Sequence, residues 1–199
     1  MRLFLQPEKG KRMAIIGFFL GLLIIPSAVV QAQSADVPRT LIAFSEEVLV
    51  PFGRNAVVIG AVRAQNARGV SLDQIKSIDR DWIATEGVTR FMLNIMSNDC
   101  ALALYNLQAR YPFIVESFVT DNKGANVGLT AKTSDYWQGD EAKFTQVYRD
   151  GAGGVLYGDM EYDESSGEIV IQVSVPVMDG NRAVGTITFS ISLDRWERR

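Results

Sequence analysis

The hydrophobic period of this chain changes at Pro112, and this change constrains the fold more than any other feature. Before Pro112, apolar residues recur at spacings of three and four, as they do along helices that pack on one side. After Pro112, short apolar runs alternate with turn-forming clusters. These runs predict five strands, over residues 113–120, 126–131, 154–162, 168–177 and 183–193. The hairpin turns between them predict antiparallel pairing.

The part of the chain before Pro112 predicts helices. The first covers residues 40–67, and Pro51 should kink it or split it in two. Ser71 and Gln74 have the spacing of a capping box, which predicts a second helix that ends near residue 84. A third helix is predicted from about residue 88 to residue 110. The fold class is therefore α+β, with a long N-terminal helix and further helices packed on a five-stranded antiparallel sheet.

Residues 1–32 have the pattern of a secretory signal. Lys9, Lys11 and Arg12 precede an uncharged apolar run, and Val30 and Ala32 suit a signal peptidase. We expect cleavage after Ala32, which would make the protein periplasmic or secreted. The alternative is an uncleaved segment that anchors the chain to the inner membrane. Residues 33–199 suit one domain, with a helical part over 33–112 and a sheet part over 113–194.

Composition excludes several classes of function. The chain contains no histidine, so Ser-His-Asp catalysis, Cys-His catalysis and histidine metal sites are excluded. Its net charge is −3 and no basic patch dominates it, which argues against nucleic acid as a partner. Cys100 is the only cysteine, so no disulfide can form within the chain, and its apolar helical neighbours predict a buried thiol.

A polar, aromatic-rich insert interrupts the strand pattern at residues 133–144, TSDYWQGDEAKF. It gathers Tyr136, Trp137 and Asp140 with Glu141 and Lys143. Pockets for small polar ligands combine a few polar groups with aromatic walls, and aromatic faces accept cations. The same aromatic rings could instead cap the core, with the charges in solvent. The residues alone leave both interpretations open.

The acidic residues offer weaker signals. Asp159, Glu161 and Asp163 alternate along a predicted strand and share one face, which could bind Ca²⁺ but more often marks a solvated face. Paired carboxylates could also act as general acid and base, but an acidic chain offers many such pairs. We therefore expect neither an enzyme nor a metal or organic cofactor.

Four segments together resemble the Cache family, the extracytoplasmic PAS-like (PDC) sensor domains of bacterial receptors. They cover residues 55–85, 118–144, 162–168 and 174–193. The resemblance implies a single Cache domain, in which a long N-terminal helix packs beside a PAS-like antiparallel sheet. It also implies a small-molecule pocket between the sheet and the insert. By position it suggests Tyr136, Trp137 and Asp140 in the insert as ligand-binding candidates. It adds Tyr148, on a short helix expected over residues 140–149 beside the insert, and Tyr157, on the central strand.

The resemblance predicts an exported sensor module that binds a small organic metabolite. The chain ends ISLDRWERR, without an apolar run long enough to span a membrane, so we expect it to act through a membrane receptor or kinase partner in signal transduction. Two copies could pair as a homodimer through the N-terminal helix. The alternative is an envelope adaptor or assembly protein that keeps the fold and binds no ligand.

Overall fold

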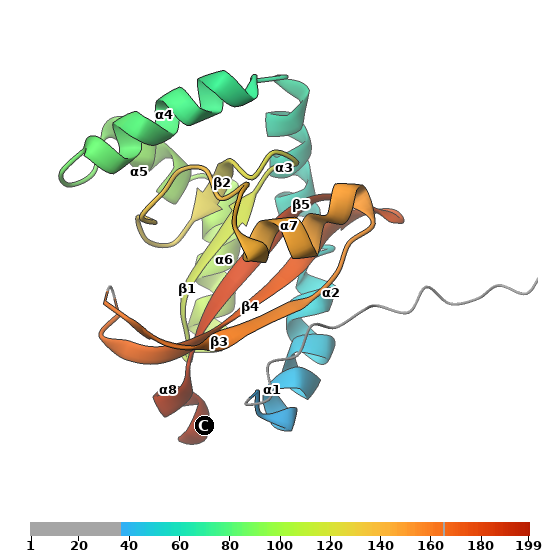
Figure 1. Ribbon diagram of the computed structural model, residues 1–199. Helices are drawn as coiled ribbons and strands as arrows, with labels where there is room; N and C mark the ends of the chain where they lie inside the picture. Colours follow the sequence, from blue (N-terminus) through green and yellow to red (C-terminus); the bar gives the residue numbers. More distant parts are fainter. Residues whose placement is uncertain (1–36, 165) are drawn as a thin grey trace, which may run out of the picture.

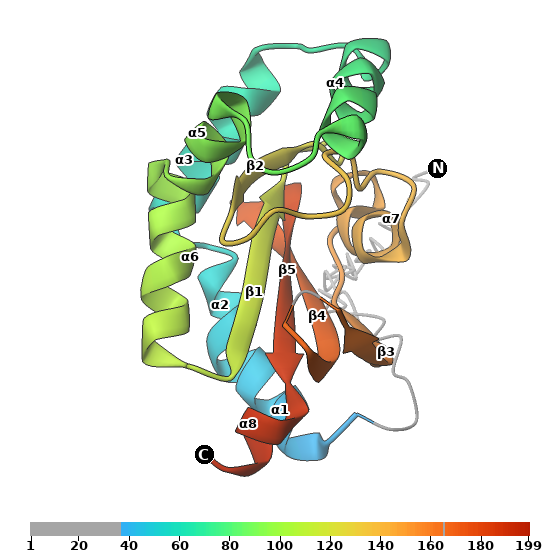
Figure 2. The ribbon, with the colours of Figure 1, turned by 90° about the vertical axis from the view of Figure 1, so that its left-hand side faces the viewer.

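A five-stranded antiparallel sheet forms the centre of the fold, with helices on both faces (Figures 1 and 2). In the computed structural model, the described residues are 37–164 and 166–199. The expected signal segment and its cleavage point lie outside them. The strand order is β2-β1-β5-β4-β3, with β1 Ile114–Thr120, β2 Asn126–Leu129, β3 Leu156–Asp163, β4 Glu168–Asp179 and β5 Arg182–Ser192. All five strands match the predicted ones to within a few residues, and the α+β, PAS-like fold is confirmed.

The N-terminal helical segment is split, as Pro51 led us to expect. It runs through α1 Arg39–Phe44, the π-helical turn η1 Ser45–Leu49 and α2 Val50–Phe52, and resumes as α3 Ala56–Ala67. The break lies just after Pro51, at Gly53, where the chain touches β4: a side chain on Gly53 would come within 2.2 Å of the Pro176 carbonyl oxygen. Asn55 then restarts the helix, because its Oδ1 accepts from the backbone N–H groups of Val57 and Val58.

Of the other predicted helices, one is confirmed and one is wrong in part. Helix α4 Leu72–Ala84 begins at the Ser71–Gln74 capping box. The single helix expected over residues 88–110 is two helices, α5 Arg90–Met96 and α6 Asp99–Arg110. Asn98 separates them, because its Oδ1 caps α6 while its Nδ2 donates to the Val127 carbonyl of β2. A short helix, α8 Leu193–Glu197, follows β5 where a strand end was expected.

The two faces of the sheet differ in chemistry. On β5, Ile187, Phe189 and Ile191 face α2, α3 and α6 and belong to the main apolar cluster. The residues that alternate with them along the strand, Thr186 and Thr188 among them, face the other side, where α7 Ala142–Tyr148 lies (Figure 2). A second, smaller apolar cluster lies under α4 and α5 and contains Ile75, Trp82, Met92, Phe118, Leu129 and Tyr136. None of the described helices has the length and hydropathy needed to cross a bilayer.

Cys100 is buried, as predicted, and packs against the backbone of β2. Burial raises the pKa of the thiol to about 12, so it stays protonated at neutral pH. Gly128 of β2 lies directly opposite, and a Cβ at Gly128 would meet the Cys100 Cβ at 2.8 Å and its Sγ at 2.9 Å. Only a glycine allows α6 to approach β2 this closely.

Gly128→Ala should therefore lower the free energy of unfolding by about 1–3 kcal/mol, because a methyl group is forced into a packed contact. Gly60→Ala is the matched control, since Gly60 lies inside α3 with no atom near its added Cβ, and it should stabilise the helix by about 0.5–1 kcal/mol. Urea unfolding of both variants measures the difference. Equal effects would contradict the close packing of α6 on β2.

Helix α8 is tied to the sheet through Glu168. The Glu168 carboxylate accepts hydrogen bonds from the Ser192 hydroxyl and from Arg195, and these bonds lower its pKa. A carboxylate whose pKa is lower in the folded state stabilises the fold above its unfolded pKa, about 4.3. This contribution is lost as the pH falls through the folded pKa.

We expect the stability difference between the wild type and Glu168→Gln to shrink as the pH falls below about 4.3. Glu197→Gln, at an exposed position on α8, should show no such trend. Urea titrations at a series of acidic pH values measure both. A pH-independent difference at Glu168 would rule out this role of its carboxylate.

Candidate functional site

Hydrogen bonds attach the insert to helix α4 and to the residue that follows it. A single carboxylate oxygen, Asp79 Oδ1, accepts hydrogen bonds from two consecutive backbone N–H groups, Tyr136 at 2.8 Å and Trp137 at 2.9 Å. The Trp82 indole N–H donates to the Thr133 carbonyl at 2.8 Å, and Lys132 Nζ donates to the Thr85 carbonyl at 2.7 Å. Helix α4 and the insert therefore form one unit.

Two buried amides hold the insert from below. Asn126 Nδ2 and Gln138 Nε2 both donate to the Asp135 carbonyl, at 3.1 and 2.9 Å. Both side chains are buried, and among the described residues neither Asn126 Oδ1 nor Gln138 Oε1 has a hydrogen-bond donor. Buried acceptors without a protein partner commonly bind a water molecule or a ligand donor. The two oxygens are therefore available to donors that enter beneath the insert.

Tyr136 turns from the insert toward the helices of the N-terminal half. Its ring packs on Trp82 and Phe91, with centroid distances of 5.7 and 5.6 Å. Burial, with a further contribution from the negative charge of Asp121, raises the pKa of Tyr136 to about 12. The hydroxyl is therefore a proton donor at neutral pH. Tyr136 also lines a cavity between α3, α5 and α6, helices that lie on the opposite side of the sheet from α7 (Figure 2).

Trp137 and Asp140 lie together in a shallower hollow between α4 and the insert. The hollow has a volume of about 340 Å³ and is also lined by Lys76, Arg80 and two further aspartates, Asp79 and Asp135. The face of Trp137 is already covered, because Lys76 Nζ lies 4.4 Å from the ring centroid. The Trp137 indole N–H donates to the Lys123 carbonyl at 2.7 Å. Asp140 is exposed.

The remaining two candidates lie apart from each other. Tyr148, at the end of α7, stacks on Phe144 with centroids 5.2 Å apart and ring planes at 15°. Tyr157 lies on β3, which is an edge strand and not the central strand that the resemblance implied. Its side chain is buried on the other face of the sheet, in the main apolar cluster, and burial raises its pKa. Of the five predicted residues, the structure therefore brings Trp137 and Asp140 into one hollow and places the other three elsewhere.

A group of polar residues that the sequence reasoning missed lines the sheet beneath α7. Thr120, Ser174, Thr186 and Thr188 come from three neighbouring strands, and each is at most 1% exposed. They bond in pairs, Thr120 to Thr186 at 2.7 Å and Ser174 to Thr188 at 2.9 Å. We call this surface the hydroxyl face. The alternating hydroxyls of TITFSIS, residues 186–192, were its signal in the sequence.

Helix α7 covers the hydroxyl face with apolar side chains. Phe144 and Val147 are its buried residues, and neither belongs to the two apolar clusters. The helix has no side-chain cap at its N-terminus. At its C-terminus Arg149 and Asp150 have positive φ angles of 47° and 52°, a strained conformation for residues other than glycine. Helix α7 is thus a short element with a strained end that packs on a polar surface.

The comparisons with known proteins concern the fold. No family model matches the sequence, and no curated protein matches it either. Solved structures similar to the chain include the sensor domain of the Vibrio cholerae histidine kinase DctB, with 15% identity and a TM-score of 0.43 over 80% of this chain and 52% of that one. The ligand-binding domain of the Campylobacter jejuni chemoreceptor Tlp3, in complex with 4-methylisoleucine, is 10% identical to this chain, with a TM-score of 0.41. The match covers 74% of this chain and 65% of that one.

The ligand-binding domain of the Pseudomonas aeruginosa chemoreceptor PctC, in complex with GABA, is 12% identical to this chain, with a TM-score of 0.39. The match covers 75% of this chain and 62% of that one. The chain thus spans between about half and two thirds of the length of these three domains. They are sensor or ligand-binding domains, the class that the sequence resembles. Because the identities and TM-scores are low, the functional argument rests on the chain's own residues.

Asp79→Ala should release the insert from α4, because the N–H groups of Tyr136 and Trp137 both lose their acceptor. We expect a loss of about 2–3 kcal/mol of stability and faster hydrogen exchange at these two amides. Asp81→Ala is the control, because Asp81 is exposed on the same helix and its carboxylate bonds to no described residue. Exchange followed by NMR reports each amide separately. Unchanged exchange in Asp79→Ala would exclude this attachment.

Proposed function

We propose that this protein is an exported, Cache-type sensor module that binds a small polar organic metabolite between the hydroxyl face and the layer formed by α7 and the insert. The observation that carries the proposal is the hydroxyl face itself. A sheet face that is buried against a helix is ordinarily apolar, whereas here Thr120, Ser174, Thr186 and Thr188 are fully covered. A polar ligand would bind to such a surface more favourably than the apolar side chains of α7 do.

The contact of α7 with the sheet is suited to opening. Burial of Phe144 and Val147 stabilises the packing of α7 on the sheet. The hydroxyls beneath them lose their hydrogen bonds to water, and only the bonds between the hydroxyls replace these. The strained residues Arg149 and Asp150 are followed by Gly151 and Gly153, both with positive φ, which allow the chain to pivot. In the proposed bound state, α7 moves outward and the ligand bonds to the hydroxyl face.

The ligand-binding candidates take different roles in this proposal. Tyr148 lies on α7 and moves with it. Trp137 and Asp140 stand at the edge of the insert, where Asp140 would attract an amine. The unpaired oxygens of Asn126 and Gln138 supply acceptors that the insert does not use. Tyr157, on the opposite face, has no contact with the ligand and serves the core.

Signal output would pass through the N-terminal helical segment. The face of β5 opposite the hydroxyl face packs on α2 and α3, so a ligand that favours one position of α7 also favours one packing of these helices. A membrane receptor or kinase in the cell envelope would bind one packing of these helices in preference to the other. A homodimer through the N-terminal helix would offer this partner two symmetric contacts. The protein would act in the periplasm, free or held by its N-terminal segment.

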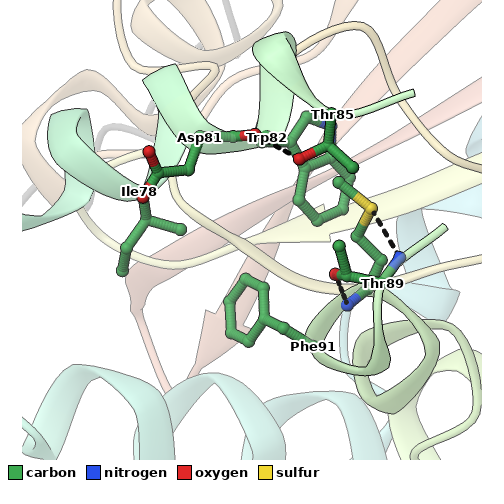
Figure 3. A pocket seen from close by; sticks show the side chains of 7 residues that line it. Ile78, Asp81, Trp82, Thr85, Thr89 and Phe91 are labelled. Carbon is green, nitrogen blue, oxygen red and sulfur yellow. Dashed lines mark hydrogen bonds between the residues drawn. The ribbon is translucent and has the colours of Figure 1, made fainter. Parts of the chain in front are cut away.

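One observation favours a second function, a non-binding envelope adaptor. Helices α4 and α5 leave a hollow of about 420 Å³ between them, walled by Ile78, Trp82 and Phe91 (Figure 3). Ile83 and Leu93 are exposed on the same two helices. Exposed apolar surface of this kind often contacts another protein. An adaptor would show no response to metabolites, and Leu93→Ser would weaken its attachment to its partner without unfolding it.

Ser174→Ala and Ser117→Ala test the sensor proposal as a matched pair. Both serines are buried, but Ser174 belongs to the hydroxyl face and Ser117 lies on the opposite face with no partner for its hydroxyl among the described residues. A thermal-shift screen against metabolites first identifies compounds that raise the melting temperature of the wild type. Ser174→Ala should then weaken binding about tenfold and lower stability by about 1 kcal/mol, whereas Ser117→Ala should leave binding unchanged. Equal affinities in the two variants would place the ligand elsewhere.

A further inference from the structure

The two edges of the sheet differ in what covers them. The strand order places β2 at one edge and β3 at the other (Figure 2). Next to β2, Asn98 Nδ2 donates to the Val127 carbonyl at 2.8 Å. The Asn126 N–H donates to the Tyr136 carbonyl of the insert at 3.0 Å. Helix α6 and the insert therefore cover the β2 edge.

Strand β3 is open along its outer edge. Within the described residues it pairs with β4 alone, and no backbone hydrogen bond joins residues 156–162 to any other segment. Four consecutive residues of the strand, 159–162, are exposed. Alternate N–H and C=O groups of an edge strand point away from the sheet, so such a strand can pair with another extended chain.

Large apolar side chains lie beside this open edge. Tyr162 is 67% exposed, Ile169 53% and Met160 48%. Met160 and Tyr162 are two positions apart on β3, and Ile169 of β4 is directly opposite Tyr162, so all three share one face of the sheet. With Leu193 of α8 they line a hollow of about 480 Å³. Charges alone would suffice to protect an edge from aggregation, so this apolar surface indicates a binding site.

Carboxylates border the apolar side chains. Asp159 and Glu161 are exposed and alternate with Met160 and Tyr162 along β3. On the other side of the hollow, Glu197 of α8 is also exposed. Within the described part of the chain, none of these three carboxylates is in an ion pair. The open edge is therefore both apolar and negatively charged.

The charge of this edge determines which partner fits it. Arg195 is paired with Glu168. Arg198 is likewise paired with Asp194, so the basic end of the chain leaves the β3 edge acidic. A second copy of this chain would bring a second Glu161 into the strand pair, where like charges are unfavourable. Nucleic acids and anionic membranes would also be repelled, whereas a basic polypeptide would be attracted.

We infer that β3 pairs with an added strand from a partner protein, an extended segment in which lysine or arginine alternates with apolar residues. Its backbone would bond to the outer N–H and C=O groups of β3. Because successive side chains of a strand point to opposite faces, its apolar residues would cover Met160 and Tyr162 while its basic residues face Glu161. Docking at this edge requires no metabolite and is separate from the proposed function.

Isothermal titration calorimetry of the purified protein with the peptide acetyl-KVKIKVK-amide tests this docking. Acetyl-KKVIVKK-amide has the same residues without the alternation, and acetyl-EVEIEVE-amide has the opposite charge. We expect saturable binding of the first peptide, about tenfold weaker binding of the second and no binding of the third. In NMR spectra, the first peptide should slow hydrogen exchange at alternate amides of β3, because only the outward N–H groups gain an acceptor.

Glu161→Lys should weaken binding of acetyl-KVKIKVK-amide about tenfold or more, because it replaces an attractive charge with a repulsive one. Glu86→Lys, at an exposed position in the loop after α4, is the matched control and should bind like the wild type. Tyr162→Ser should weaken binding several-fold, whereas Leu93→Ser, at an exposed position on α5, should not. Thermal melting checks that all four variants fold.

Three results would each overturn the assignment of this edge. They are the absence of saturable binding of acetyl-KVKIKVK-amide, equal affinities for this peptide and acetyl-KKVIVKK-amide, and equal affinities of Glu161→Lys and Glu86→Lys for it. None of the three bears on metabolite binding at the hydroxyl face, so the proposed function is tested separately.

Discussion

The carboxylate of Asp79 determines how the insert presents its side chains. One oxygen accepts the N–H groups of both Tyr136 and Trp137, which fixes the backbone of two adjacent residues at once. With the backbone held, the two side chains leave it in different directions, Tyr136 toward α5 and Trp137 toward Lys76. Tyr136 and Trp137 therefore line two different hollows, and both depend on this attachment.

This geometry explains why the fold could be predicted from the sequence and the site could not. The strands follow from alternation, and the start of α4 follows from Ser71 and Gln74, because these signals are local. Whether neighbouring aromatic residues share a pocket depends on a contact with α4, 57 and 58 residues away in the chain. The break between α5 and α6 has the same origin, since Asn98 bonds to Val127 of a strand.

The structure sorts the candidate residues by the face of the sheet that they occupy. Tyr148 and Tyr157 are only nine positions apart in the sequence, yet the first lies on α7 and the second in the cluster on the other face. The hydroxyl face could have been read from residues 186–192, because serine and threonine alternate there with apolar residues. Such alternation usually indicates a solvated face, and only the position of α7 shows that it is buried.

In the function that we propose, the division of β5 into two faces separates the residues that support the core from those that bind the ligand. Ile187, Phe189 and Ile191 support the core, whereas the hydroxyl of Thr186 bonds to Thr120 and the hydroxyl of Thr188 bonds to Ser174. Under this proposal, a change of Thr to Ser on the hydroxyl face would alter ligand binding while Ile187, Phe189 and Ile191 keep their packing. The strand can therefore accumulate substitutions on one side during evolution while the other side stays constant, which lets a single scaffold acquire new specificities by a few mutations.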